Sequence, residues 1–159
     1  MPIVYLLEET VLSIKLDGSN TEELELYMKN EEVFTLYCPE GDRESWNLET
    51  TKNSFWLGYY VSNKLKGVMF IEQRPNAYLM LHPYMLKKYR EYKFKMIKLF
   101  EKWTKEKTSN GKIVVEFPSF YDNLTKFAEE CGYKLMCINT KSYLLGSVFY
   151  DSLMYGKEM

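Results

Sequence analysis

The chain has 159 residues, of which 46% are apolar and 27% are charged, and its formal net charge is −1. A chain of this size and composition buries a core of its own, so we expect residues 1–159 to form a single domain. Three cysteines without a C-x-x-C pair and a lone histidine argue against a disulfide framework and against a metal site. The sequence contains neither a run of about eighteen apolar residues nor a basic amino-terminal region, so we expect a cytoplasmic protein without a membrane partner.

Charge is divided unevenly along the chain. Residues 1–80 carry 7 Lys and Arg against 13 Asp and Glu, whereas residues 81–159 carry 14 against 9. Most of the positive charge in the second half falls on one predicted helix, and no nucleic-acid-binding motif accompanies it. Nucleic acid is therefore not an expected partner.

The first half of the chain predicts strands and one short helix. Apolar and alternating runs indicate strands at 3–7 and 11–16, and Ser19 or Asn20 is a suitable N-cap for a short helix that reaches Met28. Residues 31–54 are mostly polar and predict a loop with room for one more helical turn. The runs 55–61 and 66–73, joined by SNKL, predict a hairpin, and residues 77–82 add a third strand to this meander.

The second half predicts two helices and three strands. An apolar stripe with helical spacing runs from Tyr89 to Trp103 and indicates a helix with one packed face. Residues 112–118 read as a buried strand, and Ser119 is the expected N-cap of a helix that ends at Gly132. The runs 133–139 and 147–156 then predict a terminal antiparallel hairpin.

Positive charge gathers at the start of the first of these helices. Segment 87–107 holds nine basic residues against three acidic ones. Lysines late in a helix suit its negative end, whereas Lys87, Lys88 and Arg90 at the start oppose the helix dipole. The segment is therefore either a solvated helix face or an anion site that uses these side chains.

This order of elements resembles the GNAT superfamily of N-acetyltransferases, and the segment NLTKFAEECGYKL is similar to the superfamily's helix that ends in glycine and an aromatic residue. The resemblance implies an α/β (α+β) fold with a GNAT-like central sheet, mixed but mostly antiparallel, flanked by helices. A closer resemblance is to phage-encoded GNAT-like proteins. It rests on His82-Pro83, Tyr89-Arg90, Phe117-Pro118, Phe127-Ala128 with Gly132-Tyr133, and Asp151.

The resemblance implies a site for acetyl-CoA. GNAT enzymes usually hold its pyrophosphate on backbone N–H groups of a glycine-containing turn that opens a helix. The matching window here, KKYREYKF, contains no glycine, so its side chains would crowd such a cradle. Cationic side chains are the alternative contact for the phosphates. The candidate acetyl-CoA contacts are Lys87, Lys88, Tyr89, Arg90, Lys93 and Asn123.

The catalytic residues that the resemblance implies are incomplete. Many GNAT enzymes carry an acid Tyr four residues before the helix-ending glycine, and here that position is Ala128. Tyr121 is more than one helical turn away. A general base for the amine is expected from the central strands, where the candidates are His82 and Glu72. No ligand set for a metal accompanies them.

Two hypotheses follow. In the first, the protein is an N-acyltransferase that moves an acetyl group from acetyl-CoA to an amine, in the gap where the fourth and fifth strands of the GNAT sheet splay. In the second, it is a catalytically degenerate GNAT-fold phage protein, a virion, structural or protein-binding component found in the host cytoplasm or the virion. The missing glycines and tyrosine favour the second hypothesis and the fold favours the first, so whether the chain is an enzyme stays open.

Overall fold

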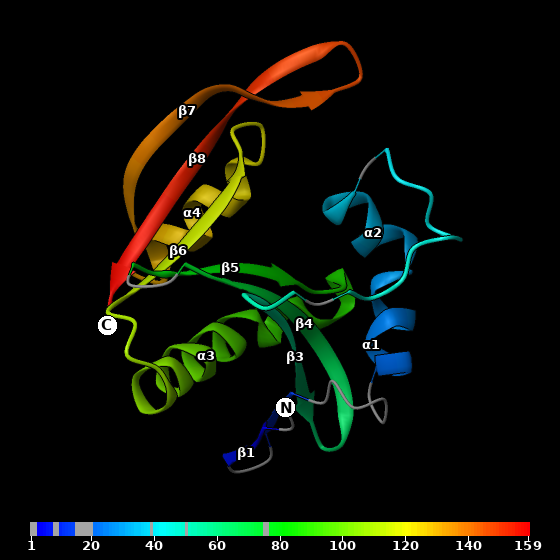
Figure 1. Ribbon diagram of the computed structural model, residues 1–159, viewed down its shortest axis with the longest axis vertical. Helices are drawn as coiled ribbons and strands as arrows, with labels where there is room; N and C mark the ends of the chain where they lie inside the picture. The colour runs from blue at the N-terminus through cyan, green and yellow to red at the C-terminus, as the bar shows by residue number, and fades with distance from the viewer. Residues whose placement is uncertain (1–2, 8–9, 15–20, 39, 50, 75–76) are drawn as a thin grey trace. The chain divides into compact units, whose positions relative to one another are not determined.

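The computed structural model describes residues 3–7, 10–14, 21–38, 40–49, 51–74 and 77–159. Contacts divide the chain into two compact units, residues 1–72 with 82–100 and residues 73–81 with 101–159. Figure 1 labels most of the elements that are described below. The single domain expected over residues 1–159 stays a prediction.

Four antiparallel strands form the sheet of the first unit and pair in chain order. They are β1 (Ile3–Leu7), β2 (Thr10–Ile14), β3 (Ser54–Val61) and β4 (Lys64–Gln73). Helices α1 (Thr21–Met28) and α2 (Glu31–Tyr37) lie between β2 and β3 in the sequence. The strands and α1 confirm the sequence predictions within the described residues, whereas positions 15–16 of the strand expected at 11–16 and the proposed caps Ser19 and Asn20 lie outside them.

Helix α2 occupies part of the segment that was expected to be mostly loop. The Asn30 side chain caps it by accepting a hydrogen bond from the Glu32 N–H at 3.1 Å. Val33 and Phe34 are buried on its inner face. The expectation of one helical turn was too short, because these two apolar residues are too few for a clear helical period.

A tight turn joins β3 to β4. Ser62 and Asn63 have φ values of 51° and 61°, the left-handed conformation that a type I′ turn needs at both central positions. Val61 and Lys64 pair on either side of it. The predicted hairpin is confirmed, and its turn is shorter than the four residues SNKL.

A hydrophobic core fills the first unit. Trp56 and Val68 from the hairpin pack with Leu24 and Met28 of α1, and all four are at most 1% exposed. Tyr37, Trp46, Phe70 and Tyr84 are partly buried and pack against this core. Such large rings contribute much of the buried area of a small unit.

The second unit holds four strands in the order β5-β6-β8-β7. They are β5 (Leu79–Tyr84, whose last three residues belong to the first unit), β6 (Lys112–Pro118), β7 (Lys134–Leu145) and β8 (Val148–Glu158). β5 and β6 pair in parallel, and the other pairs are antiparallel. The predicted class, α/β with a mixed and mostly antiparallel sheet flanked by helices, is confirmed.

Helices follow β5 and β6 in the sequence. A 3₁₀ helix, η1 (Lys87–Tyr92), leads directly into α3 (Lys93–Lys107), and α4 (Asp122–Glu130) follows β6. η1 with the first part of α3 belongs to the first unit. The predicted stripe is confirmed from Met96 on, since Met96, Leu99, Phe100 and Trp103 are at most 7% exposed. Its first two members, Tyr89 and Tyr92, lie in η1 and are partly buried. No helix within the described residues is long and apolar enough to cross a membrane.

The predicted C-terminal end of α4 is confirmed, and its predicted N-cap is wrong. Gly132 has a φ of +86°, as expected of the residue that ends the helix. Ser119 was the wrong N-cap, because Tyr121 occupies that position and the Ser119 N–H donates to the Asp151 carbonyl at 2.8 Å. The helix therefore starts later than its capping signal suggested.

Candidate active site

His82 and Glu72, the two candidate bases, are brought together in the first unit. His82 Nε2 lies 2.9 Å from Glu72 Oε2, and their side chains are 23% and 34% exposed. The Phe70 ring stacks on the imidazole, with ring centres 5.7 Å apart and planes inclined by 28°. The imidazole is therefore held from one side by a carboxylate and along its face by an aromatic ring.

The carboxylate also determines which imidazole nitrogen can accept a proton. An ionised Glu72 can only accept a hydrogen bond, so His82 Nε2 carries the proton of this contact. In the neutral ring the free lone pair then lies on Nδ1. A half-buried histidine whose tautomer is set by a carboxylate, with its lone pair on Nδ1, has the chemistry of a general base.

Aromatic rings continue from this pair into the core. Phe70 contacts the buried Trp56 at 4.6 Å between ring centres, and Trp56 contacts Tyr37 at 6.0 Å. Tyr37 in turn lies 5.6 Å from Tyr84, edge to face. These ring contacts hold Phe70, and through it the imidazole of His82, against the aromatic core of the first unit.

The basic start of the predicted helix is the 3₁₀ segment η1. Lys87, Lys88 and Arg90 are exposed, and Tyr89 and Lys93 are partly buried. Lys66 Nζ lies 4.1 Å from the centre of the Tyr89 ring and Lys88 Nζ lies 4.9 Å from it, so the ring makes cation–π contacts with two lysines. Four of the six candidate acetyl-CoA contacts thus lie on η1, and a fifth, Lys93, is the first residue of α3.

An acidic side chain already accepts a hydrogen bond from the first backbone N–H of η1. The Lys87 N–H donates to Glu32 Oε1 at 2.8 Å. A phosphate at this position would have to displace the carboxylate and would be repelled by it while it stayed. The residues present therefore do not fit the usual backbone cradle for pyrophosphate, although their side chains could bind an anion at the surface.

Tyr27 holds the chain in place just before η1. Its hydroxyl donates to the Lys66 carbonyl at 2.7 Å and accepts from the Leu86 N–H at 2.9 Å. Burial raises the pKa of Tyr27 to about 12. The hydroxyl therefore stays protonated at neutral pH and can make both bonds. Sequence reasoning missed Tyr27, Lys66 and Glu32, because their partners are 39 to 59 residues away along the chain.

Asn123, the sixth candidate contact, is exposed on α4 in the second unit. The structure does not test its role. Within the described residues, no group of three or more His, Cys, Asp or Glu side chains is placed to hold a metal ion.

The position of the missing acid tyrosine is filled by packing. Ala128 is 6% exposed on the inner face of α4. Tyr121, at the N-cap of this helix, has its ring centre 4.4 Å from that of Phe120, and burial raises its pKa. The structure offers no space at Ala128 for a proton donor of the expected kind.

We expect the substitution Ala128→Tyr to lower the free energy of unfolding by about 1–3 kcal/mol, because the larger ring overpacks a buried position. Glu130→Tyr on the exposed face of the same helix is the control and should change stability by less than about 0.5 kcal/mol. Urea unfolding measures both. An Ala128→Tyr protein that is as stable as wild type would show that the position opens to solvent.

No family model matches the chain, and no curated protein matches it. Several solved structures do match the chain. A probable acetyltransferase of the GNAT family from Chromobacterium violaceum superposes with a TM-score of 0.80 at 11% identity, over 98% of this chain and 90% of that one. The chain has the GNAT fold.

Two further structures show the same likeness. RimL, a ribosomal L7/L12 alpha-N-protein acetyltransferase in complex with coenzyme A, gives a TM-score of 0.78 at 13% identity over 99% of this chain and 98% of that one. MccE, a microcin C7 self-immunity acetyltransferase in complex with acetyl-CoA and AMP, gives 0.72 at 16% identity over 96% and 94%. At these identities the likeness shows the fold alone.

Proposed function

We propose that this protein transfers an acetyl group from acetyl-CoA to an amine, with His82 as the general base. The observation that carries the proposal is the contact of His82 Nε2 with Glu72 Oε2 at 2.9 Å. This contact orients His82 so that its ring can act as a base. Solved structures with the same fold include complexes with coenzyme A and acetyl-CoA.

His82 has one task in this reaction. An amine becomes a nucleophile only when it gives up its extra proton, and Nδ1 of His82 accepts it while Glu72 stabilises the imidazolium that results. Phe70 limits the rotation of the imidazole, so the nitrogen stays aimed in one direction. Acetyl-CoA supplies the activated acetyl group: the C–N bond forms as the thioester C–S bond breaks, and coenzyme A leaves as a thiolate that takes its proton from water.

The cations of η1 bind the phosphates of acetyl-CoA through side chains in this proposal. Lys87, Lys88 and Arg90 are exposed and can reach an anion without backbone contacts. Because Glu32 holds the first N–H, binding depends on these exposed charges and is weaker than in a backbone cradle. Exposed charges are screened by salt, with a Debye length of about 10 Å at 0.1 M and about 3 Å at 1 M.

Calorimetric titration with acetyl-CoA tests this binding. We expect weak binding at low salt, a marked loss of affinity at high salt, and no detectable binding when Lys87, Lys88 and Arg90 are all replaced by Ala. The control replaces Lys95, Lys102 and Lys105, three exposed lysines of α3, and should bind as wild type does. Both triple variants should keep the wild-type Tm within a few degrees, because the changes are on the surface.

Tight, salt-insensitive binding that survives the Lys87, Lys88 and Arg90 replacement would contradict the assigned contacts. Absence of any binding by the wild-type protein would contradict the acetyltransferase itself. It would favour the alternative, a GNAT-fold phage protein that has lost catalysis and serves as a virion, structural or protein-binding component. The bond between the Lys87 N–H and Glu32 bears on one part of this alternative, the loss of the usual backbone contact for the phosphates.

A further inference from the structure

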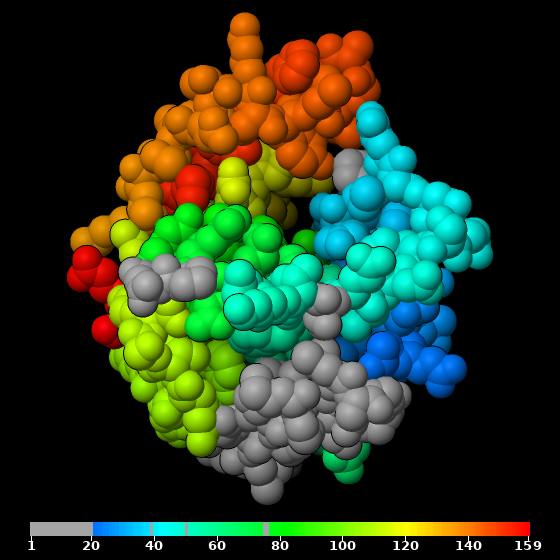
Figure 2. Space-filling model, viewed as in Figure 1, coloured from blue at the N-terminus to red at the C-terminus, as the bar shows by residue number. Residues whose placement is uncertain are grey.

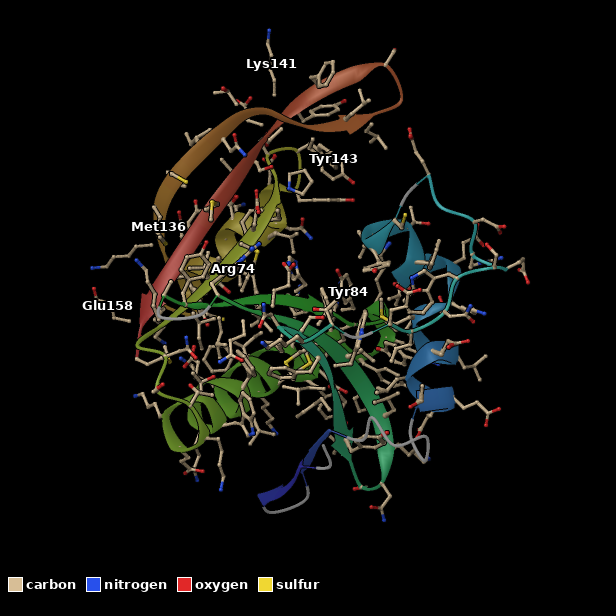
Figure 3. All side chains as sticks on the ribbon, viewed as in Figure 1. Arg74, Tyr84, Met136, Lys141, Tyr143 and Glu158 are labelled. Atoms are coloured by element: carbon tan, nitrogen blue, oxygen red, sulfur yellow. The ribbon has the colours of Figure 1, made fainter. Side chains whose placement is uncertain are left out.

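One side of the sheet in the first unit carries aromatic rings next to His82. Trp56 and Phe70 pair directly across β3 and β4, so both lie on the same side of the sheet. The Phe70 ring stacks on His82, and Tyr84 lies two positions further along β5, so it shares this side. Figure 3 labels Tyr84 at the end of β5. Trp56 is 1% exposed, whereas Phe70 and Tyr84 are only partly buried.

Two further rings come from α2 and from the segment that follows it. Tyr37, the last residue of α2, has its ring centre 5.6 Å from that of Tyr84 and 5.5 Å from that of Trp46. Trp46 in turn lies 6.0 Å from Trp56. Tyr37 and Trp46 are partly exposed, and Figure 2 shows residues 40–49, in cyan, at the surface. We use the name aromatic wall for Tyr37, Trp46, Phe70 and Tyr84.

Carboxylates are few where the aromatic wall meets the base. Glu72 is the single acidic residue among those that the strands place on this side near the imidazole, at positions 54, 56, 68, 70, 72, 82 and 84. Its carboxylate already contacts His82 Nε2 at 2.9 Å. Aromatic rings with a small number of placed polar groups are typical of a small-molecule site. A single carboxylate suits an acceptor with one ammonium group better than it suits a polycation.

We propose that the acceptor amine carries an aromatic ring, which packs on the aromatic wall while the amine nitrogen meets Nδ1 of His82. This inference rests on the acetyltransferase proposed above and names the class of its acceptor. Phe70 joins the two parts, because its ring centre is 5.7 Å from that of the imidazole and 4.6 Å from that of Trp56. A ligand ring two carbon atoms from its nitrogen therefore reaches the wall while the nitrogen stays at the base. Ring-to-ring contacts favour a small set of orientations, so the wall also orients the amine.

The binding of two matched amines tests the ligand class without acetyl-CoA. Phenylalaninamide and alaninamide are both α-amino amides and differ by one phenyl ring. Phenylalaninamide should shift the NMR signal of the Trp46 indole N–H in a saturable way, because its ring current acts on the wall. Its affinity should exceed that of alaninamide about tenfold or more, the factor that burial of a phenyl ring supplies. The signal is assigned by its absence from the Trp46→Leu variant.

Two wall variants and one control test the location. Tyr84→Leu and Tyr37→Leu should each weaken the binding of phenylalaninamide about tenfold, and thermal unfolding shows whether each variant is folded. Phe94→Leu, at a ring that is 47% exposed on α3, is the matched control and should bind as the wild type does. In acetyl transfer, the wild type should prefer phenylalaninamide through a lower KM, and this preference should fall in both wall variants.

Equal affinity of the wild type for the two amides would overturn the proposal, and so would a preference that both wall variants keep. Acetylation of the two amides with the same kcat/KM would support the acetyltransferase and overturn the aromatic acceptor. Saturable binding of phenylalaninamide at Trp46 without acetylation of either amide would support the ligand class of the wall and contradict the acetyltransferase.

Discussion

Replacing His82 by Gln is expected to lower kcat/KM for acetyl transfer by about 100-fold or more and to leave the affinity for acetyl-CoA unchanged. The Gln amide nitrogen can replace Nε2 as the donor to Glu72, so the contact at this end of the side chain is kept. What the substitution removes is the basic lone pair on Nδ1. If the rate falls while the fold and the binding of acetyl-CoA are unchanged, the variant has lost proton transfer.

Thiol release from acetyl-CoA in the presence of an amine measures the rate. The amines tested are a free amino acid, a peptide with a free amino terminus, a polyamine and an aminoglycoside. Glu72→Gln is the companion variant and should cause a smaller loss, because it removes the orienting charge but keeps the base. A His82→Gln protein as active as wild type would show that the proton leaves by another route, and a wild-type protein inactive on every amine would leave the acetyltransferase proposal without support.

The elements that were predicted correctly are those with a local signal. The β3–β4 hairpin follows from two β-rich runs and short polar connections, and the α3 stripe follows from a period that Met96, Phe100 and Trp103 keep. Gly132 ends α4 because a positive φ suits glycine. In each case the residues that determine the structure are neighbours in the sequence.

The features that were missed depend on distant contacts. Glu32 is 55 residues from the Lys87 N–H that it binds, and nothing in either segment indicates the other. The length of β7 was underestimated for a different reason. Residues 140–145 read TKSYLL, three polar residues followed by three apolar ones with the left-handed Lys141 among them, so the sequence there shows no alternation typical of a strand.

In the candidate site, too, the features with a local signal were predicted and the contacts between distant residues were not. Both candidate bases, His82 and Glu72, were named from the sequence, but their contact was not, because they lie ten positions apart on two different strands whose register the sequence does not give. The absence of glycine in KKYREYKF was visible in the sequence. Glu32, whose carboxylate binds the Lys87 N–H where a phosphate would otherwise bind, could be found only in the folded chain.

A buried ion pair provides the largest stability effect that we expect in the second unit. Lys157 Nζ lies 3.1 Å and 3.2 Å from the two carboxylate oxygens of Glu101 and donates to the Cys131 carbonyl at 2.9 Å. The side chains of Lys157 and Glu101 are 25% and 10% exposed. Burial, followed by the charge of Glu101, raises the pKa of the nearby Tyr133 hydroxyl, so this hydroxyl adds no second negative charge at neutral pH.

Lys157→Met should lower the free energy of unfolding by about 2–4 kcal/mol, because it leaves the Glu101 carboxylate buried without its cation; the range is reduced for the partial exposure of Lys157. The double variant Lys157→Met with Glu101→Leu should recover most of the loss, since the apolar pair no longer contains a buried charge. Lys126→Met, on the exposed face of α4, is the control and should stay within about 0.5 kcal/mol of wild type. Urea unfolding of the wild type, the single variant, the double variant and the control measures these differences in the free energy of unfolding. If the double variant is no more stable than Lys157→Met alone, the loss comes from the bond to Cys131 or from packing, and not from an unpaired charge on Glu101.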